Sequence, residues 1–134
     1  MIERYSREEL KSIWSDFNKY SLWLKIEIAA AEAMEKYKII PKGVSKKVRR
    51  KAKINTKRIL EIEKKVKHDV IAFLTSITEK VGKEAKYLHK GMTSSDVLDT
   101  CFNLQLKQSG EILIKDLDLL LSLIHISEPT RLRH

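Results

Sequence analysis

A polar segment at residues 89–96 holds the side chains best suited to binding an anion. It reads H-K-G-M-T-S-S-D, so Gly91 allows an unusual backbone conformation just before Thr93 and Ser94. An apolar helical pattern follows, and the first N–H groups of a helix have no partners within it. Hydroxyls and free N–H groups together can bind a carboxylate or a phosphate. The same residues can also form an ordinary N-cap, because Ser, Thr and Asp are common in front of apolar helices.

The second candidate for chemistry is Lys67-His68-Asp69, which separates two apolar patterns. A histidine beside an aspartate can transfer a proton. An exposed or capping His-Asp pair without a chemical role is the alternative interpretation. A thiol occurs only once, at Cys101, inside an apolar helical pattern. We therefore expect a small buried side chain there and not a nucleophile.

The composition favours long helices. The chain has 134 residues, 43% of them hydrophobic, but only four Gly and two Pro, whereas a sheet protein would need turn residues at short intervals. We therefore expect an all-α protein. A single cysteine cannot form a disulfide within the chain, and no apolar run approaches the ~20 residues of a membrane span. We expect a cytoplasmic protein without a signal peptide, membrane contact, metal or cofactor.

The net charge of +9 comes from one basic segment, residues 42–58. This segment has no acidic residue, and its basic residues are Lys42, Lys46, Lys47, Arg49, Arg50, Lys51, Lys53, Lys57 and Arg58. A basic face can bind nucleic acid nonspecifically, but no aromatic residue is interleaved here for base stacking. We favour a solvated helix face and expect no nucleic-acid partner.

Apolar spacing predicts two helices near the start of the chain. The first, at 7–17, begins with a capping box in which Ser6 is the N-cap and Glu9 reaches back to it. The second, at 20–38, has a broad apolar face expected in the core, made of Leu22, Trp23, Ile26, Ala29, Ala30, Ala33, Met34 and Tyr37. A short, exposed third helix is expected within the basic segment.

Cap and stop signals place the remaining elements. Asn55 begins a fourth helix, and a fifth ends at Gly82. A loop at 83–92 then leads to the last helix, which begins near Ser94 or Ser95. Its expected length of ~25 residues is more typical of helical bundles and assemblies than of a small globular domain.

Four segments together resemble the adenylosuccinate lyases of the fumarase/aspartase superfamily. The run M-T-S-S-D-V-L-D-T at 92–100 resembles the first signature region of that family. The segments I-E-R-Y-S at 2–6, W-L-K-I-E-I-A at 23–29 and K-H-D-V-I-A-F-L at 67–74 are similar to its N-terminal arm, its second helix and its R-H-D-V-x-A-F segment. Their order and spacing agree with the family over residues 1–120.

The resemblance implies a fold and a reaction. Residues 1–93 would form the N-terminal helical domain, and residues 94–120 would begin the first long helix of a central bundle. The reaction would be β-elimination of fumarate from adenylosuccinate, or from its carboxamide-ribotide relative, in purine nucleotide biosynthesis. Such a reaction needs a base, an acid for the leaving nitrogen, and fixed donors for the developing charge. The family assembles its sites across the subunits of a homotetramer.

The resemblance also implies which residues contact this purine nucleotide substrate. They are Arg4, Tyr5, Lys67, His68, Asp69, His89, Thr93 and Ser94. Arg4 and Tyr5 would bind the nucleotide end of the substrate. Thr93 and Ser94 would bind a succinyl carboxylate through their hydroxyls and the N–H groups of the helix start.

The remaining positions have supporting roles in the resemblance. His68 would orient or support the general acid, with Asp69 beside it, and His89 is a weaker candidate for substrate contact. Lys67 keeps the charge of the family's arginine but not its bidentate fork, and Lys90 stands where an aromatic is common. The family's general acid and base lie in later T/S-H-G and S-S-A-M-P-x-K-x-N segments, which do not occur in this sequence. We therefore expect the chain alone to be inactive.

Residues 121–134 depart from the family pattern, and Pro129 interrupts the helical periodicity. The segment is similar to the translation of a transposon adapter used in sequencing libraries, so we expect a non-native tail, which genomic reads across its codons would test. Two other function classes stay open at this point. One is a basic helical module that binds nucleic acid, and the other is a helical oligomerisation module without chemistry.

Overall fold

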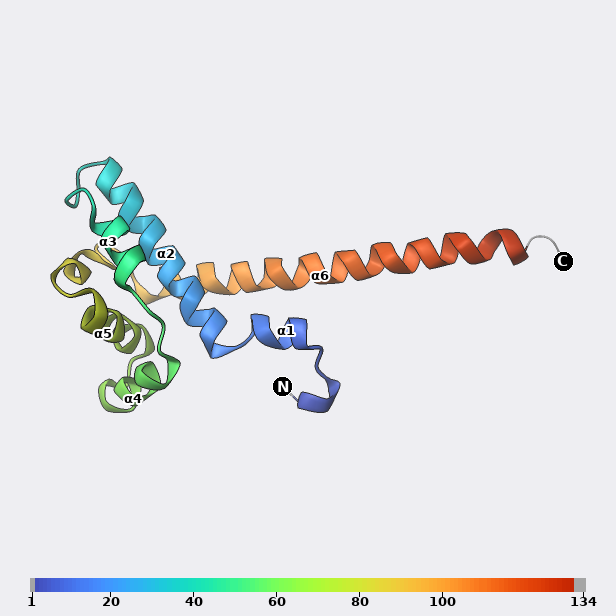
Figure 1. Cartoon of the computed structure of the whole chain (residues 1–134), viewed down its shortest axis with the longest axis horizontal. Coiled ribbons are helices and arrows are strands. Elements are labelled where there is room, and N and C mark those ends of the chain that lie inside the picture. Colours follow the sequence, from blue (N-terminus) through green and yellow to red (C-terminus); the bar gives the residue numbers. More distant parts are fainter. Residues whose placement is uncertain (1, 132–134) are drawn as a thin grey trace.

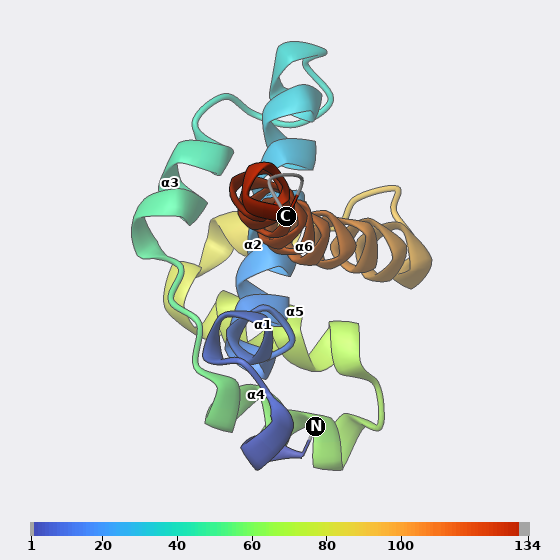
Figure 2. The same ribbon diagram turned by 90° about the vertical axis from the view of Figure 1, so that its right-hand side faces the viewer.

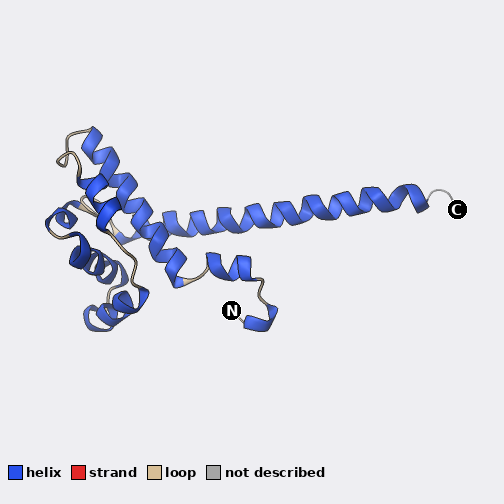
Figure 3. Ribbon diagram, viewed as in Figure 1, coloured by secondary structure: helices blue, strands red, loops and turns tan. Residues whose placement is uncertain are grey.

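Six α-helices and two short 3₁₀ helices form the computed structural model, which describes residues 2–131. In chain order they are η1 (Glu3–Tyr5), α1 (Glu8–Ile13), α2 (Asp16–Lys36), α3 (Val44–Lys51), α4 (Thr56–Val66), α5 (Asp69–Val81), η2 (Lys83–Tyr87) and α6 (Ser94–Arg131). No strand occurs among the described residues, and the predicted all-α class is confirmed (Figure 3). The helices α2 to α5 gather at one end of α6, which crosses α2 and extends beyond the others as one long helix (Figures 1 and 2).

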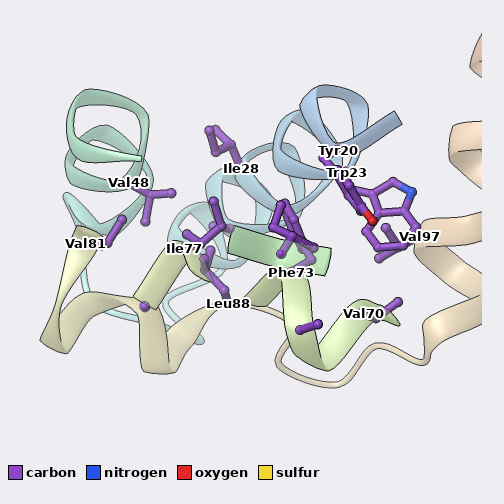
Figure 4. Close-up of a cluster of buried hydrophobic side chains, with 14 of the residues drawn as sticks. Tyr20, Trp23, Ile28, Val48, Val70, Phe73, Ile77, Val81, Leu88 and Val97 are labelled. Carbon is purple, nitrogen blue, oxygen red and sulfur yellow. The ribbon is translucent and has the colours of Figure 1, made fainter. Parts of the chain in front are cut away.

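An aromatic cluster at the centre of the core joins α2 to α5. Trp23 meets Tyr20 edge-on at 5.3 Å between ring centroids and meets Phe73 edge-on at 5.5 Å, while Tyr20 and Phe73 stack at 6.2 Å. Val97, in the first turn of α6, is fully buried in the same core (Figure 4). Burial of large aromatic side chains is the main stabilising term in a domain of this size. It also holds the start of α6 against α2.

The predicted first helix is wrong in both its cap and its end. Ser6 does not cap it, because its hydroxyl donates to the carbonyl of Ile2 at 2.7 Å. Helix α1 instead begins after Arg7, whose side chain makes no cap. The chain then turns, and Ser15 accepts the N–H of Asn18 at 3.2 Å as the N-cap of α2. A strong cap inside one apolar stretch thus divides it into two helices.

The buried face of α2 also differs from the prediction. Its buried residues are Tyr20, Leu22, Trp23, Glu27, Ile28 and Ala31. Ala29, Ala33 and Tyr37, which were expected in the core, are exposed. The two faces of α2 are similar in hydropathy, because alanine carries little apolar surface, so packing against the aromatic cluster decides which one is buried. The buried face contains one charged residue, Glu27.

The basic segment folds partly as predicted. Helix α3 is short, but Val44 and Val48 bury one side of it, so the expectation of an exposed helix holds only for its basic side. Three basic side chains form ion pairs, which are Lys47–Glu84, Arg49–Glu32 and Arg58–Glu79. These pairs tie the segment to α2, α5 and η2, which supports the interpretation as a solvated helix face.

The predicted caps at Asn55 and Gly82 and the predicted start of the last helix are confirmed. Asn55 accepts the N–H of Arg58 at 3.0 Å at the start of α4. Gly82 ends α5 with a φ of +83°, a conformation that glycine adopts at little cost. Helix α6 begins at Ser94, as expected.

Helix α6 is longer than predicted. It has 38 residues and continues past Pro129, so the expected break is absent from the described part of the chain. Pro129 has no N–H to donate within the helix. The Leu- and Ile-rich turns before Pro129 are helical, and the helix continues past the proline. We define the α6 stripe as four of its exposed apolar residues that recur at helical spacing, Leu106, Leu113, Leu117 and Leu120. None of the described helices combines the length and the apolar character needed to cross a membrane.

The segment around α1 is tied to the side of α6. The side-chain amide of Gln105 donates to the carbonyl of Ile13 at 2.9 Å, and the indole N–H of Trp14 donates to the hydroxyl of Ser109 at 3.2 Å. Arg7 forms an ion pair with Asp116 further along α6. These contacts hold α1 beside α6, and η1 lies beyond α1, away from the beginning of α6 (Figures 1 and 2).

A carboxylate from α2 caps α3. The N–H of Ser45 donates to Glu35 Oε1 at 2.6 Å, and this hydrogen bond lowers the pKa of the Glu35 carboxyl. We predict that Glu35→Gln reduces the free energy of unfolding at pH 7 by less than about 1 kcal/mol, the range for a charge at a helix N-terminus. A carboxyl with a lowered folded pKa stabilises only while ionised. The difference in stability between Glu35→Gln and the unaltered protein should therefore disappear at low pH. It should shrink as the pH falls from 4.5, the ordinary pKa of a glutamate, through the lowered pKa of Glu35.

Urea unfolding followed by circular dichroism at several pH values measures this difference. Glu111→Gln is the matched control, because Glu111 is exposed on α6 and should change nothing. A loss of stability in Glu35→Gln that stays constant down to pH 2 would contradict the assignment of the cap.

Candidate functional site

The start of α6 forms a tight capped corner. The N–H of Thr93 donates to Asp96 Oδ2 at 2.7 Å, and the N–H of Asp96 donates back to the carbonyl of Thr93 at 3.2 Å. The Thr93 hydroxyl lies 3.3 Å from the same Asp96 oxygen. The Thr93 hydroxyl is therefore already used inside the corner. The N-cap interpretation is confirmed for this pair.

Ser94 is the unengaged donor of this corner. Within the described residues its hydroxyl has no hydrogen-bond partner, and neither do the backbone N–H groups of Ser94 and Ser95. These three donors stand at the positive end of a long helix, where an anionic oxygen is favoured. An oxygen of a carboxylate can accept from them without displacing any existing hydrogen bond. Of the two predicted carboxylate-binding residues, only Ser94 offers a free hydroxyl.

His89 approaches the same corner from the other side of Gly91. Its backbone N–H donates to Glu27 Oε2 at 2.8 Å, and its ring Nδ1 lies 2.6 Å from Glu27 Oε1. The imidazole is mostly buried, and the Glu27 side chain is completely buried. Sequence reasoning had missed Glu27. The available signal was a charged residue one turn from Trp23 on the apolar side of α2.

His68 is the N-cap of α5. Its Nδ1 accepts the N–H of Ile71 at 3.3 Å, so in a neutral ring the hydrogen is on Nε2. Asp69 lies 3.6 Å away from Nδ1 and accepts the N–H of Val70 at 2.7 Å. Both side chains are about two-fifths exposed. The ring can therefore donate from Nε2 to a group outside the chain while Nδ1 holds the helix start.

Lys67 closes α4 immediately before this cap. Its φ of +56° is left-handed, and its N–H donates to the carbonyl of Glu63 at 2.8 Å. The side chain is exposed. The conformation turns the chain between α4 and α5, and it leaves the ammonium of Lys67 at the surface beside His68.

Arg4 and Tyr5 lie in η1, and both are exposed. The Arg4 guanidinium stands 4.7 Å from the centre of the Tyr5 ring, a cation–π contact that orders both side chains. They have no hydrogen bond or ion pair to any other predicted site residue in the described part of the chain.

The predicted site residues thus form three separate groups. His89, Thr93 and Ser94 share the corner at the start of α6. A second group lies at the turn between α4 and α5, and a third lies in η1, beyond α1 (Figure 1). No hydrogen bond or ion pair connects the groups across the described residues. The predicted site residues therefore lie on separate surfaces of the chain.

Cys101 has the environment predicted for it. The thiol is buried within α6 and lies 3.8 Å from the carbonyl of Lys19. Burial raises the pKa of the Cys101 thiol, so the nucleophilic thiolate is disfavoured. It is a packing residue of the α2–α6 contact.

The cap function of His68 can be separated from any chemistry. We predict that His68→Ala lowers the free energy of unfolding by about 1 kcal/mol, because the α5 N-cap is lost. His68→Asn should retain most of the stability, since the Asn side chain is among the best N-caps. Urea denaturation of the chain measures both variants, and equal losses in both would mean that the cap does not matter.

Comparison with known proteins agrees with the fold and the motifs. The sequence profile of a family described as lyase matches residues 3–127. The adenylosuccinate lyase of Bacillus subtilis (strain 168) is 47% identical over 124 residues, which are 92% of this chain and 29% of that protein. The chain therefore spans less than a third of the length of this relative. The resemblance to adenylosuccinate lyases is confirmed.

The fold has a counterpart among solved structures. The crystal structure of a fumarate lyase from Mesorhizobium sp. BNC1 matches with a TM-score of 0.69 and 23% sequence identity. The match covers 76% of this chain and 25% of that one, and it supports the N-terminal helical domain of that fold. Since the family profile covers nearly the whole chain, from η1 into the second half of α6, this protein belongs to the lyase family.

Proposed function

We propose that this chain is the succinyl-binding part of an adenylosuccinate lyase. The reaction is β-elimination of fumarate from adenylosuccinate, and from its carboxamide-ribotide relative, in the purine and AMP biosynthesis of the cytoplasm. The observation that carries the proposal is the set of free donors at Ser94. These donors lie in a segment that resembles the signature region of the family, and a relative from that family is 47% identical to this chain. Three unused donors at a helix start suit one carboxylate group.

The chemistry explains why such donors are needed. When a base removes the proton next to a carboxylate, negative charge moves onto that carboxylate before the C–N bond breaks. The Ser94 hydroxyl and the N–H groups of Ser94 and Ser95 stabilise this charge, because they are already oriented by the capped corner. Thr93 and Asp96 serve mainly to hold the corner in shape.

The other two groups bind and orient. His68 donates from Nε2 to the general acid or to the substrate, while its Nδ1 is held by α5 and Asp69 stands beside it. Lys67 adds a positive charge next to it for an anionic group. Arg4 and Tyr5 bind the nucleotide end through guanidinium and ring stacking.

The groups meet in an assembly of several chains. The catalytic acid and base are supplied by later segments of the enzyme, and sites form between subunits of a homotetramer. Two features support this: the separation of the three groups within one chain, and the exposed α6 stripe, which repeats at helical spacing. Residues 1–93 then form the N-terminal domain, and residues 94–120 begin the central bundle. The proposed non-native tail, 121–134, overlaps the family match at residues 121–127. No nucleic acid or membrane takes part.

A chimeric enzyme tests the proposal. The matched 124-residue segment of this chain would replace its counterpart in the Bacillus subtilis enzyme. We predict that the chimera converts adenylosuccinate to AMP and fumarate, followed by absorbance, and that the 134-residue chain alone does not. Binding residues without an oriented acid and base give no acceleration of the chemical step. Turnover by the chain alone, above that of its His68→Ala variant, would contradict the placement of the catalytic groups.

The role of Ser94 is tested in the same chimera. We predict that Ser94→Ala lowers kcat/KM. The loss should correspond to roughly 2–4 kcal/mol of transition-state stabilisation, the usual effect of losing one such donor. Ser21→Ala on α2 is the control for loss of a hydroxyl. Unchanged kcat/KM in Ser94→Ala would remove Ser94 from the site.

A further inference from the structure

Glu27 is a completely buried carboxylate whose two oxygens contact one residue. Oε2 accepts the backbone N–H of His89 at 2.8 Å, and Oε1 lies 2.6 Å from Nδ1 of the same residue. The side chain of Glu27 is 0% exposed. An unpaired carboxylate in such a place is strongly unfavourable. Glu27 and His89 therefore form an obligatory pair that joins α2 to the corner at the start of α6.

This pairing determines which ring nitrogen of His89 carries a hydrogen. The backbone N–H can only donate, so Oε2 accepts it. In its ordinary ionised form a glutamate carries no hydrogen on Oε1. Oε1 is then also an acceptor, and the hydrogen between it and the ring lies on Nδ1. Nε2 is the ring nitrogen left for other contacts, and the side chain keeps 18% of its surface exposed. Glu27 thereby leaves Nε2, which has no hydrogen in the neutral ring, as the nitrogen that His89 presents to other groups.

The same pairing holds the backbone of the corner. His89 has a φ of +58°, which is unfavourable for a residue with a Cβ and persists only where surrounding contacts enforce it. The contact from Glu27 to its N–H is such a contact. The carbonyl of His89 then accepts the N–H of Met92 at 3.3 Å, and the next residue, Thr93, begins the capped corner. Hydrogen bonds thus extend from Glu27 through His89 to Met92, two residues before Ser94.

We infer that Glu27 is a positioning residue for substrate binding: it fixes the Nδ1–H form of His89 and the backbone turn that places Ser94. The functional half of this inference rests on the proposed function, whereas the state of the His89 ring does not. A purely structural ion pair would also stabilise the fold. It would not, however, make activity depend on which nitrogen of His89 holds the hydrogen.

Glu27→Gln separates the two roles because it keeps the size of the side chain. The amide oxygen must face the N–H of His89, so the amide NH₂ faces Nδ1 and can only donate to it. In the variant Nδ1 becomes an acceptor and the hydrogen moves to Nε2. The corner can stay folded while His89 presents a donor in place of an acceptor.

Nitrogen-15 NMR of the chain with labelled histidines shows which ring nitrogen carries the hydrogen. The His89→Gln variant lacks this ring and so identifies the His89 signals. In the unaltered chain we expect Nδ1 of His89 to resonate as a protonated nitrogen, and in Glu27→Gln as an unprotonated one. An unprotonated Nδ1 in the unaltered chain would overturn the inference even if the variant did not fold. Glu32→Gln, on the exposed side of α2, should leave the His89 signals unchanged.

Activity is then measured in the chimera described above. We expect Glu27→Gln to lower kcat/KM at least about tenfold, as for other partners that orient a histidine, and to alter the pH profile, while Glu32→Gln stays within about twofold. A folded Glu27→Gln chimera with the activity of the Glu32→Gln control would overturn the positioning role. An inactive parent chimera would contradict the proposed function, and the NMR result would still decide whether Glu27 sets the state of His89.

Discussion

Burial of Trp23 against Tyr20 and Phe73 is the constraint on which the other parts of the structure depend. The indole meets both rings edge-on, and Val97 of α6 is buried in the same cluster. Because Glu27 follows Trp23 by one helical turn, the rotation of α2 that buries the indole also directs the carboxylate toward His89. Core packing and the geometry of the α6 corner are therefore set by a single helix face.

The residues assigned to binding also hold the ends of helices. His68 caps α5, and the Thr93–Asp96 pair caps α6. Three non-glycine residues of the described chain have a positive φ. Two of them lie at these helix starts: Lys67 directly precedes His68, and His89 lies in the turn that leads to Thr93. The strain of such backbone conformations is balanced by hydrogen bonds from neighbouring elements. A substitution at these positions therefore changes the stability of a helix end as well as any binding role proposed for the residue.

Much of this fold could be predicted from the sequence because its strongest signals are local. The cap at Asn55, the helix start at Ser94 and the glycine stop after α5 each depend on residues within one turn. The prediction for the first helix was wrong at its start because the Ser6 hydroxyl donates to the carbonyl of Ile2, and at its end because Ser15 begins a new helix.

The candidate site residues came from residue types and motif resemblance, which pointed to His68, His89 and Ser94. The partner of Nδ1 in His68 is the N–H of Ile71, within one turn of the chain. The partner of Nδ1 in His89 is Glu27, which only the fold brings near it. Glu27 and His89 are 62 residues apart, and a glutamate in a helix ordinarily indicates the solvent side. Long-range pairing of this kind has no periodic signature in the sequence.

The position of the α6 stripe has a consequence for synthesis on the ribosome. Every buried residue of the described chain lies at or before Gln105, and the stripe begins at the next residue, Leu106. The nascent chain therefore contains its complete helical core before any part of the stripe has been translated. When the stripe leaves the exit tunnel, it is attached to a domain that can already be folded, and its exposed apolar side chains are the main target for chaperones.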